Sequence, residues 1–166
     1  MVKAFISGCA GTRLSPAEGA FFAAEQPWGL ILFKRNCSDR DQIPALVEEF
    51  RAAVGRSDAP VLIDCVNGWL AGTMAAAGCW DAGDAADADD DAAAERLAVA
   101  VDDLVDAWSA TGGRVIAVTN EVGMALVPTT RAGRWFTEEL GSLNQALAAT
   151  ADEVWQLTAG IATRLR

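Results

Sequence analysis

The stretch Ala59-Pro60-Val61-Leu62-Ile63-Asp64-Cys65-Val66-Asn67-Gly68-Trp69-Leu70 carries the pattern from which we predict the fold. A proline followed by branched apolar residues and then a carboxylate is typical of a buried parallel strand. Asp64 would stand at the carboxyl end of that strand, where open α/β sheets bind their ligands. The alternative for Asp64 is a strand-end carboxylate that caps a neighbouring helix or loop.

Apolar strands and amphipathic helices alternate on both sides of this stretch. Strands are predicted at residues 3–8, 29–33, 61–64, 114–119 and 153–158. Ser15-Pro16-Ala17-Glu18 predicts a capped helix start, and Asp41 and Gly55 are expected to bound the next helix. Further helices are predicted over 69–77, around Leu97 to Trp108, and after Pro128.

This alternation predicts one three-layer αβα domain over residues 1–166, built on a five-stranded parallel sheet. The expected strand order is 2-1-3-4-5, as in Rossmann or flavodoxin-like folds, with a P-loop-kinase-like 2-3-1-4-5 order as the alternative. Five strands are too few to close a barrel. We therefore expect an open sheet.

Composition restricts the function classes. The net charge is −10, and residues 65–166 hold six Lys or Arg against fifteen Asp or Glu, which disfavours nucleic acid as a partner. Histidine is absent, which excludes Ser-His-Asp and Cys-His catalytic sites. No stretch is apolar enough to span a membrane, and no secretory signal is evident. We expect a soluble cytoplasmic protein with no membrane partner and no obligate protein partner.

Three features invite a ligand-site interpretation and have a simpler alternative. Gly8-Cys9-Ala10-Gly11 follows a strand, but no lysine follows its glycines, so we interpret it as a turn and not as a phosphate loop. Cys9, Cys37 and Cys65 each follow a predicted strand, and we expect small buried apolar residues in preference to a thiolate metal site. The six aspartates within residues 81–91 are expected to form a solvated loop that leads into a helix, in preference to a cation site.

Residues 1–64 resemble the start of the family-three glycoside hydrolases, specifically the bacterial β-N-acetylglucosaminidases, which are TIM barrels. The matching residues are Gly8-x-Ala10-Gly11-x-x-Leu14-Ser15-Pro16-Ala17-Glu18, Phe21-Phe22, Gln26-Pro27-Trp28-Gly29-Leu30-Ile31-Leu32-Phe33-Lys34-Arg35-Asn36, Arg51 to Arg56 and Ala59 to Asp64. The resemblance implies that Asp64 helps to hold a sugar. A glycosidase needs two carboxylates across the scissile bond, and the later barrel units have no counterpart here.

Residues 61–166 resemble the bifunctional adenosylcobinamide kinase and adenosylcobinamide-phosphate guanylyltransferase family. The motifs are Leu62-Ile63-Asp64-Cys65-x-x-x-Trp69-Leu70, Thr119-Asn120-Glu121-Val122-Gly123-Met124-x-x-Val127-Pro128, Glu139-Leu140-Gly141-x-Leu143-Asn144-Gln145 and Ala151-Asp152-Glu153-Val154. The resemblance implies that Asp64 lies near the nucleotide's magnesium and that Asn120 and Glu121 line the phosphate side. The family's phosphate-loop lysine and guanylylated histidine are absent from this sequence.

Since both resemblances meet at Val61 to Asp64, we interpret the chain as an engineered or recombined chimera of residues 1–64 and 65–166. We expect no selected catalytic activity, no catalytic or metal residues and no cofactor. The alternative is a weak nucleotide- or phosphate-binding protein that uses Asp64, Asn120 and Glu121, with GTP and magnesium as ligands. An idle, inherited strand end is the simpler interpretation of Asn120 and Glu121.

Overall fold

The computed structural model describes residues 1–38, 42–80 and 89–166. The chain divides into two compact units, one made of residues 1–66 and 111–119 and the other of residues 67–110 and 120–166. Each unit is described by itself below. The expected single domain over the whole chain stays a prediction.

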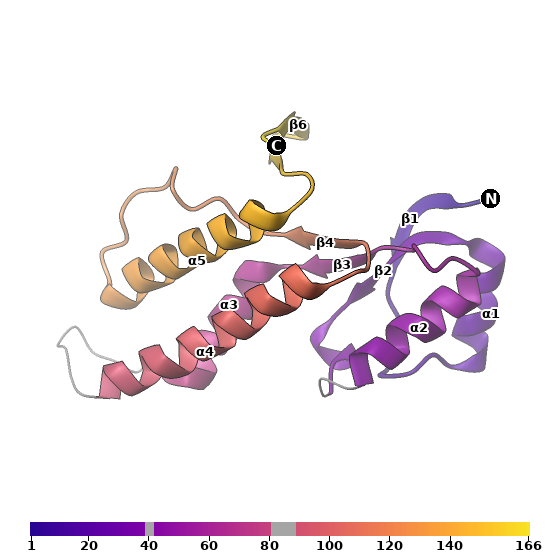
Figure 1. Ribbon diagram of the computed structural model, residues 1–166, viewed down its shortest axis with the longest axis horizontal. Helices are drawn as coiled ribbons and strands as arrows, with labels where there is room; N and C mark the ends of the chain where they lie inside the picture. Colours follow the sequence, from indigo (N-terminus) through magenta and orange to yellow (C-terminus); the bar gives the residue numbers. More distant parts are fainter. Residues whose placement is uncertain (39–41, 81–88) are drawn as a thin grey trace. The chain divides into compact units, whose positions relative to one another are not determined.

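The first unit contains a four-stranded parallel sheet (Figure 1). Its strands are β1 (Lys3–Ser7), β2 (Pro27–Leu32), β3 (Val61–Asp64) and β4 (Val115–Val118), and they lie side by side in that order. Parallel strands need crossover connections. Helix α1 (Pro16–Glu25) connects β1 to β2, and the short 3-10 helix η1 (Lys34–Asn36) and helix α2 (Gln42–Val54) connect β2 to β3.

The ends of α1 follow the sequence signals. The Ser15 side chain accepts a hydrogen bond from the Glu18 backbone N–H, and the Glu18 carboxylate accepts one from the Ser15 N–H, so the expected capping box is confirmed. Gln26 adopts a left-handed conformation as the C-cap, and Pro27 then starts β2. Gly55, with a φ of 66°, ends α2 in the same way.

The core of the first unit lies between its helices and its sheet. Phe22 of α1 and Phe50 of α2 pack edge to face with ring centroids 5.2 Å apart, and both side chains are fully buried with Leu30 and Leu46. Because α1 and α2 contact each other, they lie on the same face of the sheet. A third layer, as expected from the sequence, would require helices on the opposite face.

The second unit is largely helical. Its helices are α3 (Val66–Ala77), of which only Val66 belongs to the first unit, α4 (Asp89–Ala110) and α5 (Arg131–Thr150). Strands β5 (Trp155–Thr158) and β6 (Ile161–Arg164) follow. Helices α4 and α5 pack against each other, and Leu97, Leu140 and Leu143 are fully buried. The Trp108 Nε1–H of α4 donates to the Leu147 carbonyl of α5 at 3.2 Å, which fixes their pairing near one end.

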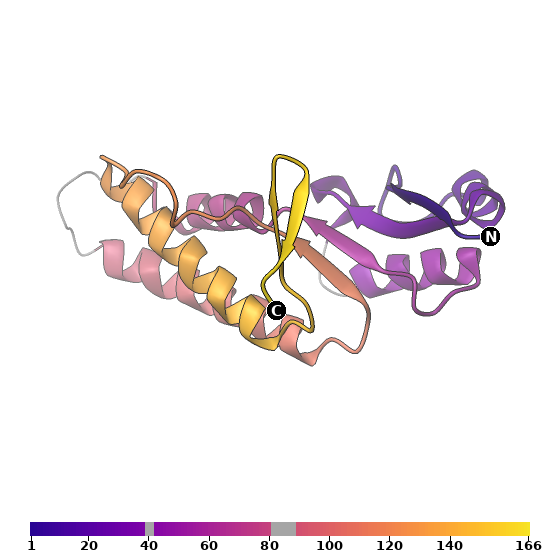
Figure 2. The same ribbon diagram turned by 90° about the horizontal axis from the view of Figure 1, so that it is seen from above.

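The prediction that residues 153–158 form a fifth parallel strand is wrong. Strand β5 pairs only with β6 among the described residues, in an antiparallel hairpin (Figure 2). Ala159 and Gly160 connect them with φ values of 51° and 80°, the pattern of a type I′ turn. The sequence signal was missed because alanine rarely occupies the first turn position at positive φ.

The predicted strand orders are also wrong, whereas the α/β class with an open parallel sheet is confirmed. The observed order β1-β2-β3-β4 arises because successive crossovers step in one direction along the sheet. Both expected orders require a reversal of direction. The hydrophobic pattern predicts that a strand is buried in a parallel sheet but not on which edge of its predecessor it pairs.

Two sequence predictions fall wholly or partly outside the described residues. The expected cap Asp41 is one of them, so only the start of α2 at Gln42 is described. The acidic loop over residues 78–95 is the other, and of its aspartates Asp89, Asp90 and Asp91 form the beginning of α4. Within the described ranges, no helix is both long and apolar enough to cross a membrane.

We predict that replacing Phe50 by alanine destabilises the first unit by about 3–5 kcal/mol, because the ring leaves a cavity beside Phe22. Phe21 precedes Phe22 in the sequence but is 46% exposed, so Phe21→Ala is the matched control. It should reduce the free energy of unfolding far less. Urea unfolding followed by tryptophan fluorescence measures both. Equal losses in the two variants would contradict the core described above.

Candidate functional site

Asp64 stands at the carboxyl end of β3, as expected. Its Cα pairs with that of Val118 in β4, and its side chain is exposed. The carboxylate makes no hydrogen bond or ion pair with any residue of the described ranges, so the capping role considered for it is not observed. An exposed carboxylate with no internal partner at this edge of a parallel sheet is accessible to a ligand.

The glycine-containing loop after β1 is held by the protein's own side chains. The fully buried Asn36 amide donates to the Cys9 carbonyl at 3.0 Å and to the Gly11 carbonyl at 2.7 Å. Burial raises the pKa of the Cys9 thiol, so this side chain stays protonated at neutral pH. The expected burial of Cys9 is therefore confirmed.

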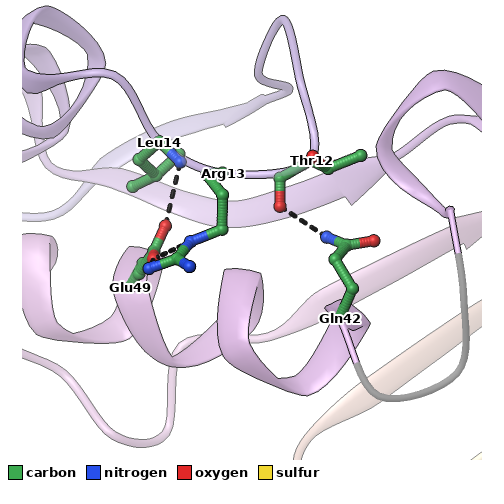
Figure 3. A network of polar contacts seen from close by, with 5 residues as sticks. All are labelled: Thr12, Arg13, Leu14, Gln42 and Glu49. Carbon is green, nitrogen blue, oxygen red and sulfur yellow. Dashed lines mark hydrogen bonds and ion pairs between the residues drawn. The ribbon is translucent and has the colours of Figure 1, made fainter.

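Two carboxylates complete the attachment of this loop. Glu49 of α2 forms an ion pair with Arg13 and accepts the Leu14 N–H at 2.9 Å, while Gln42 donates to the Thr12 carbonyl (Figure 3). Glu18 accepts the Ala10 N–H at 2.7 Å. The Ala10 N–H, which a bound phosphate would need as a donor, is thus already bonded to the Glu18 carboxylate. This agrees with the interpretation of the loop as a turn.

The same contacts perturb the acidity of both glutamates. The Ser15 hydroxyl, together with the backbone N–H groups of Ser15 and Ala10, holds the pKa of Glu18 below its ordinary value. The Arg13 guanidinium, followed by the Leu14 N–H, lowers the pKa of Glu49. Both shifts favour the charged carboxylates that hold the loop.

Asn120 and Glu121 lie in an exposed loop of the second unit, immediately after β4. The Glu121 carboxylate accepts the Gly123 N–H at 2.6 Å, and the Asn120 carbonyl accepts a hydrogen bond from the Asn144 amide of α5 at 3.0 Å. A Cβ at position 123 would lie 2.9 Å from Glu121 Oε1, so glycine allows the carboxylate to close this turn. The two predicted residues are thus brought together in one well-anchored turn.

Asp64 and the Asn120–Glu121 pair belong to different compact units. Their joint action stays a prediction. Asn144 is the residue that sequence reasoning missed, because its motif on α5 does not indicate a contact with Asn120. Its position on α5 directly after the core residue Leu143 could have indicated a side chain at the border of the core.

Other candidate centres gain no support from the geometry. Within residues 1–38, 42–80 and 89–166, no three His, Cys, Asp or Glu residues are grouped closely enough to hold a metal ion. Cys79 is buried like Cys9, whereas Cys37 is exposed and Cys65 half-buried, so the expectation of burial is wrong for Cys37. A pocket of about 330 Å³ between the first turns of α4 and α5 is lined by Asp91, Ala94, Arg131, Arg134, Trp135 and Glu138, none of which was predicted.

Comparison with known proteins identifies one family across most of the chain. The family model described as cobinamide kinase / cobinamide phosphate guanyltransferase matches residues 38–165. The bifunctional adenosylcobalamin biosynthesis protein CobU of Salmonella typhimurium is 44% identical over 81 residues, which cover 46% of this chain and 43% of that protein. Its namesake in Escherichia coli is 35% identical over 109 residues, covering 64% and 58%.

A third relative, the bifunctional adenosylcobalamin biosynthesis protein CobP of Pseudomonas aeruginosa, is 29% identical over 119 residues, covering 69% of this chain and 60% of that protein. The chain spans about half the length of the curated relatives it matches. All three relatives carry names of biosynthetic proteins.

These matches correct our interpretation of the chain as a chimera. The family model begins at residue 38 and runs through Val61 to Asp64, where we placed a junction between two families. The engineered or recombined chimera without selected activity is therefore wrong, and so is the expectation that the chain is not an enzyme. The glycoside hydrolase resemblance of residues 1–64 gains no support, since the matched family already includes residues 38–64.

We predict that Glu49→Gln reduces the free energy of unfolding by about 1 kcal/mol at neutral pH, because the ion pair with Arg13 is lost. A carboxylate whose pKa is lowered on folding stabilises the protein above its unfolded pKa of about 4.3 and loses that contribution as the pH falls through the folded pKa. The difference between the wild type and the variant should therefore shrink on acidification.

Urea unfolding at a series of pH values between neutral and strongly acidic measures this difference. Glu48→Gln is the matched control, since Glu48 is the preceding residue of α2, is largely exposed and pairs with Arg51 three residues away. A difference between the wild type and Glu49→Gln that stays constant down to the lowest pH would contradict the role given to the Glu49 carboxylate.

Proposed function

This chain belongs to the cobinamide kinase / cobinamide phosphate guanyltransferase family, and on that premise we propose that it binds a magnesium–guanosine nucleotide through the turn formed by Asn120 to Gly123. The observation that carries the proposal is the geometry of Glu121, an exposed carboxylate held in place by the Gly123 N–H at 2.6 Å. This turn lies within the residues that the family model matches.

The donor set of the turn fits magnesium. Hard cations prefer oxygen ligands, and the turn offers the Glu121 carboxylate and the side-chain oxygen of Asn120. Magnesium, when bound, would neutralise charge on the nucleotide's phosphates. Since one carboxylate oxygen is already used by the Gly123 N–H, the other is the one we assign to the cation.

Asp64 is the second carboxylate of the proposal. It is exposed at the ligand-binding edge of the sheet and forms no hydrogen bond or ion pair within the described ranges. In keeping with the family resemblance, we propose that Asp64 contributes to nucleotide binding at this edge of the sheet. This assignment is tested separately from that of Glu121, because the two residues lie in different units.

We propose that the γ-phosphoryl group of GTP is transferred to a hydroxyl group of a cobinamide, which loses its proton while GDP leaves. Alternatively, the guanylyl group of GTP is transferred to the phosphate of a cobinamide phosphate, and pyrophosphate leaves. Such transfer depends mainly on positioning and on neutralising the phosphate charge. This chain contains no histidine, so a covalent guanylyl-histidine cannot form on its own residues.

Calorimetric titration of the purified protein with GTP and magnesium tests the binding. We predict saturable binding that Glu121→Gln weakens about tenfold, which corresponds to about 1.4 kcal/mol, because the variant keeps the size of the side chain but removes its charge. Asp64→Asn is expected to weaken binding in the same direction. Glu95→Gln, at an exposed position of α4, is the control and should bind like the wild type.

Absence of saturable heat at millimolar nucleotide would refute the proposal, as would equal affinity of the wild type and Glu121→Gln. Where binding is found, incubation with GTP, magnesium and cobinamide, followed by chromatography of the products, measures transfer directly. We expect phosphorylated or guanylylated cobinamide to be formed by the wild type and to be reduced in both carboxylate variants.

A further inference from the structure

We infer that Asn144 is a positioning residue, which sets the orientation of the peptide between Asn120 and Glu121 and thereby aims Glu121 at its ligand. The Asn144 Nδ2–H donates to the Asn120 carbonyl at 3.0 Å across 24 positions of sequence. The ligand in this inference is that of the proposed function, on which this part of the inference rests. The orientation of the peptide itself does not depend on it.

The helix that carries Asn144 provides a fixed platform. Leu140, Leu143 and Leu147 of α5 are all buried, so the backbone on either side of Asn144 is anchored in the core of the second unit. The Asn144 side chain is only partly exposed. A short side chain on an anchored helix loses little conformational entropy when it forms a hydrogen bond, which makes it suited to holding a loop.

The hydrogen bond from Asn144 to the Asn120 carbonyl fixes the whole peptide group between Asn120 and Glu121. A trans peptide group is planar, with its C=O and N–H pointing in opposite directions. Because the Asn120 carbonyl points toward Asn144, the Glu121 N–H must point away from α5. The peptide therefore presents the Glu121 N–H on the side away from the helix, where a backbone donor can contact a phosphate oxygen.

The rest of the turn depends on this orientation. Glu121 Oε1 accepts the Gly123 N–H at 2.6 Å, and Gln156 of β5 approaches the Met124 sulfur at 3.8 Å, a weak contact at the other end of the loop. The Asn144 contact is thus the strong anchor at the start of the loop. Its loss should let the Asn120–Glu121 peptide rotate, and a displacement of about 1 Å can cost a factor of about 100 in rate.

The acceptor, the Asn120 carbonyl, belongs to an exposed residue. An effect of Asn144 on the orientation of the loop can therefore be distinguished from an effect on the stability of the fold. Asn120 is exposed, so water can replace Asn144 at the carbonyl when the amide is removed. We therefore expect the loop to become mobile without unfolding of the helix. A residue that only stabilised the fold would show the opposite pattern.

The test compares Asn144→Asp, which keeps the shape but removes the donor, with Gln145→Glu, which adds the same charge at the next, exposed position of α5. Nitrogen-15 relaxation measures the order parameters of the Glu121 and Gly123 amides. We expect them to fall in Asn144→Asp from about 0.85 toward 0.6, with the amides of α5 unchanged. Gln145→Glu should match the wild type.

Titration with GTP and magnesium then gives the functional consequence. We expect Asn144→Asp to raise the dissociation constant about tenfold, and the double variant with Glu121→Gln to bind no more weakly than the weaker single variant, because both act through one carboxylate. Asn144→Ala and Gln145→Ala form a second pair without added charge. They decide the question if Asn144→Asp does not fold.

Unchanged order parameters at Glu121 and Gly123 in Asn144→Asp and Asn144→Ala would overturn the inference. Two outcomes would overturn the part that concerns the ligand. One is a fall in the order parameters without any change in nucleotide affinity, and the other is fully additive losses of affinity in the double variant. If the wild type binds no nucleotide, the proposed function fails, while the order parameters still decide whether Asn144 orients the peptide.

Discussion

The sheet of the first unit depends on β3 being paired along both of its edges. On one side Leu30 to Leu32 of β2 lie in register with Val61 to Ile63, and on the other side Val115 to Val118 of β4 lie in register with Val61 to Asp64. The approach to β2 is close, since a Cβ on Gly29 would come within 2.8 Å of the Pro60 carbonyl. Position 29 therefore requires glycine. Strand β3 joins the N-terminal strands to β4 in one sheet.

Much of this local structure could be predicted from the residues. Ser15, Pro16 and Glu18 form the expected helix start because capping depends on neighbours three positions away. The apolar strands and the helix stripes were predictable for the same reason, since hydrophobic periodicity reflects local geometry. Strand order and the antiparallel hairpin were not, because they depend on which distant edge a strand meets and on a positive φ at Ala159 that its side chain does not favour.

The candidate site shows the same division. Asp64, Asn120 and Glu121 could be selected as chemically suitable groups at strand ends, because their sequence positions indicate where each strand stops. The contact from Asn144 to the Asn120 carbonyl could not, since it joins positions 24 residues apart through a side chain and a backbone atom. The interpretation as a chimera failed for a related reason. Two partial resemblances that meet at one strand do not reveal that a single family runs across it.

The central position of β3 also has a consequence for synthesis of the chain on the ribosome. Strands β1 to β3 are complete when residue 64 has been made, but the partner of the outer edge of β3 does not exist until residue 118 has left the exit tunnel. At about 5–20 residues per second, that interval lasts several seconds. During it, an apolar strand presents unpaired N–H and C=O groups to solvent, a template for mispairing between nascent chains. Chaperone dependence should thus be concentrated in the interval between the synthesis of residue 64 and that of residue 118.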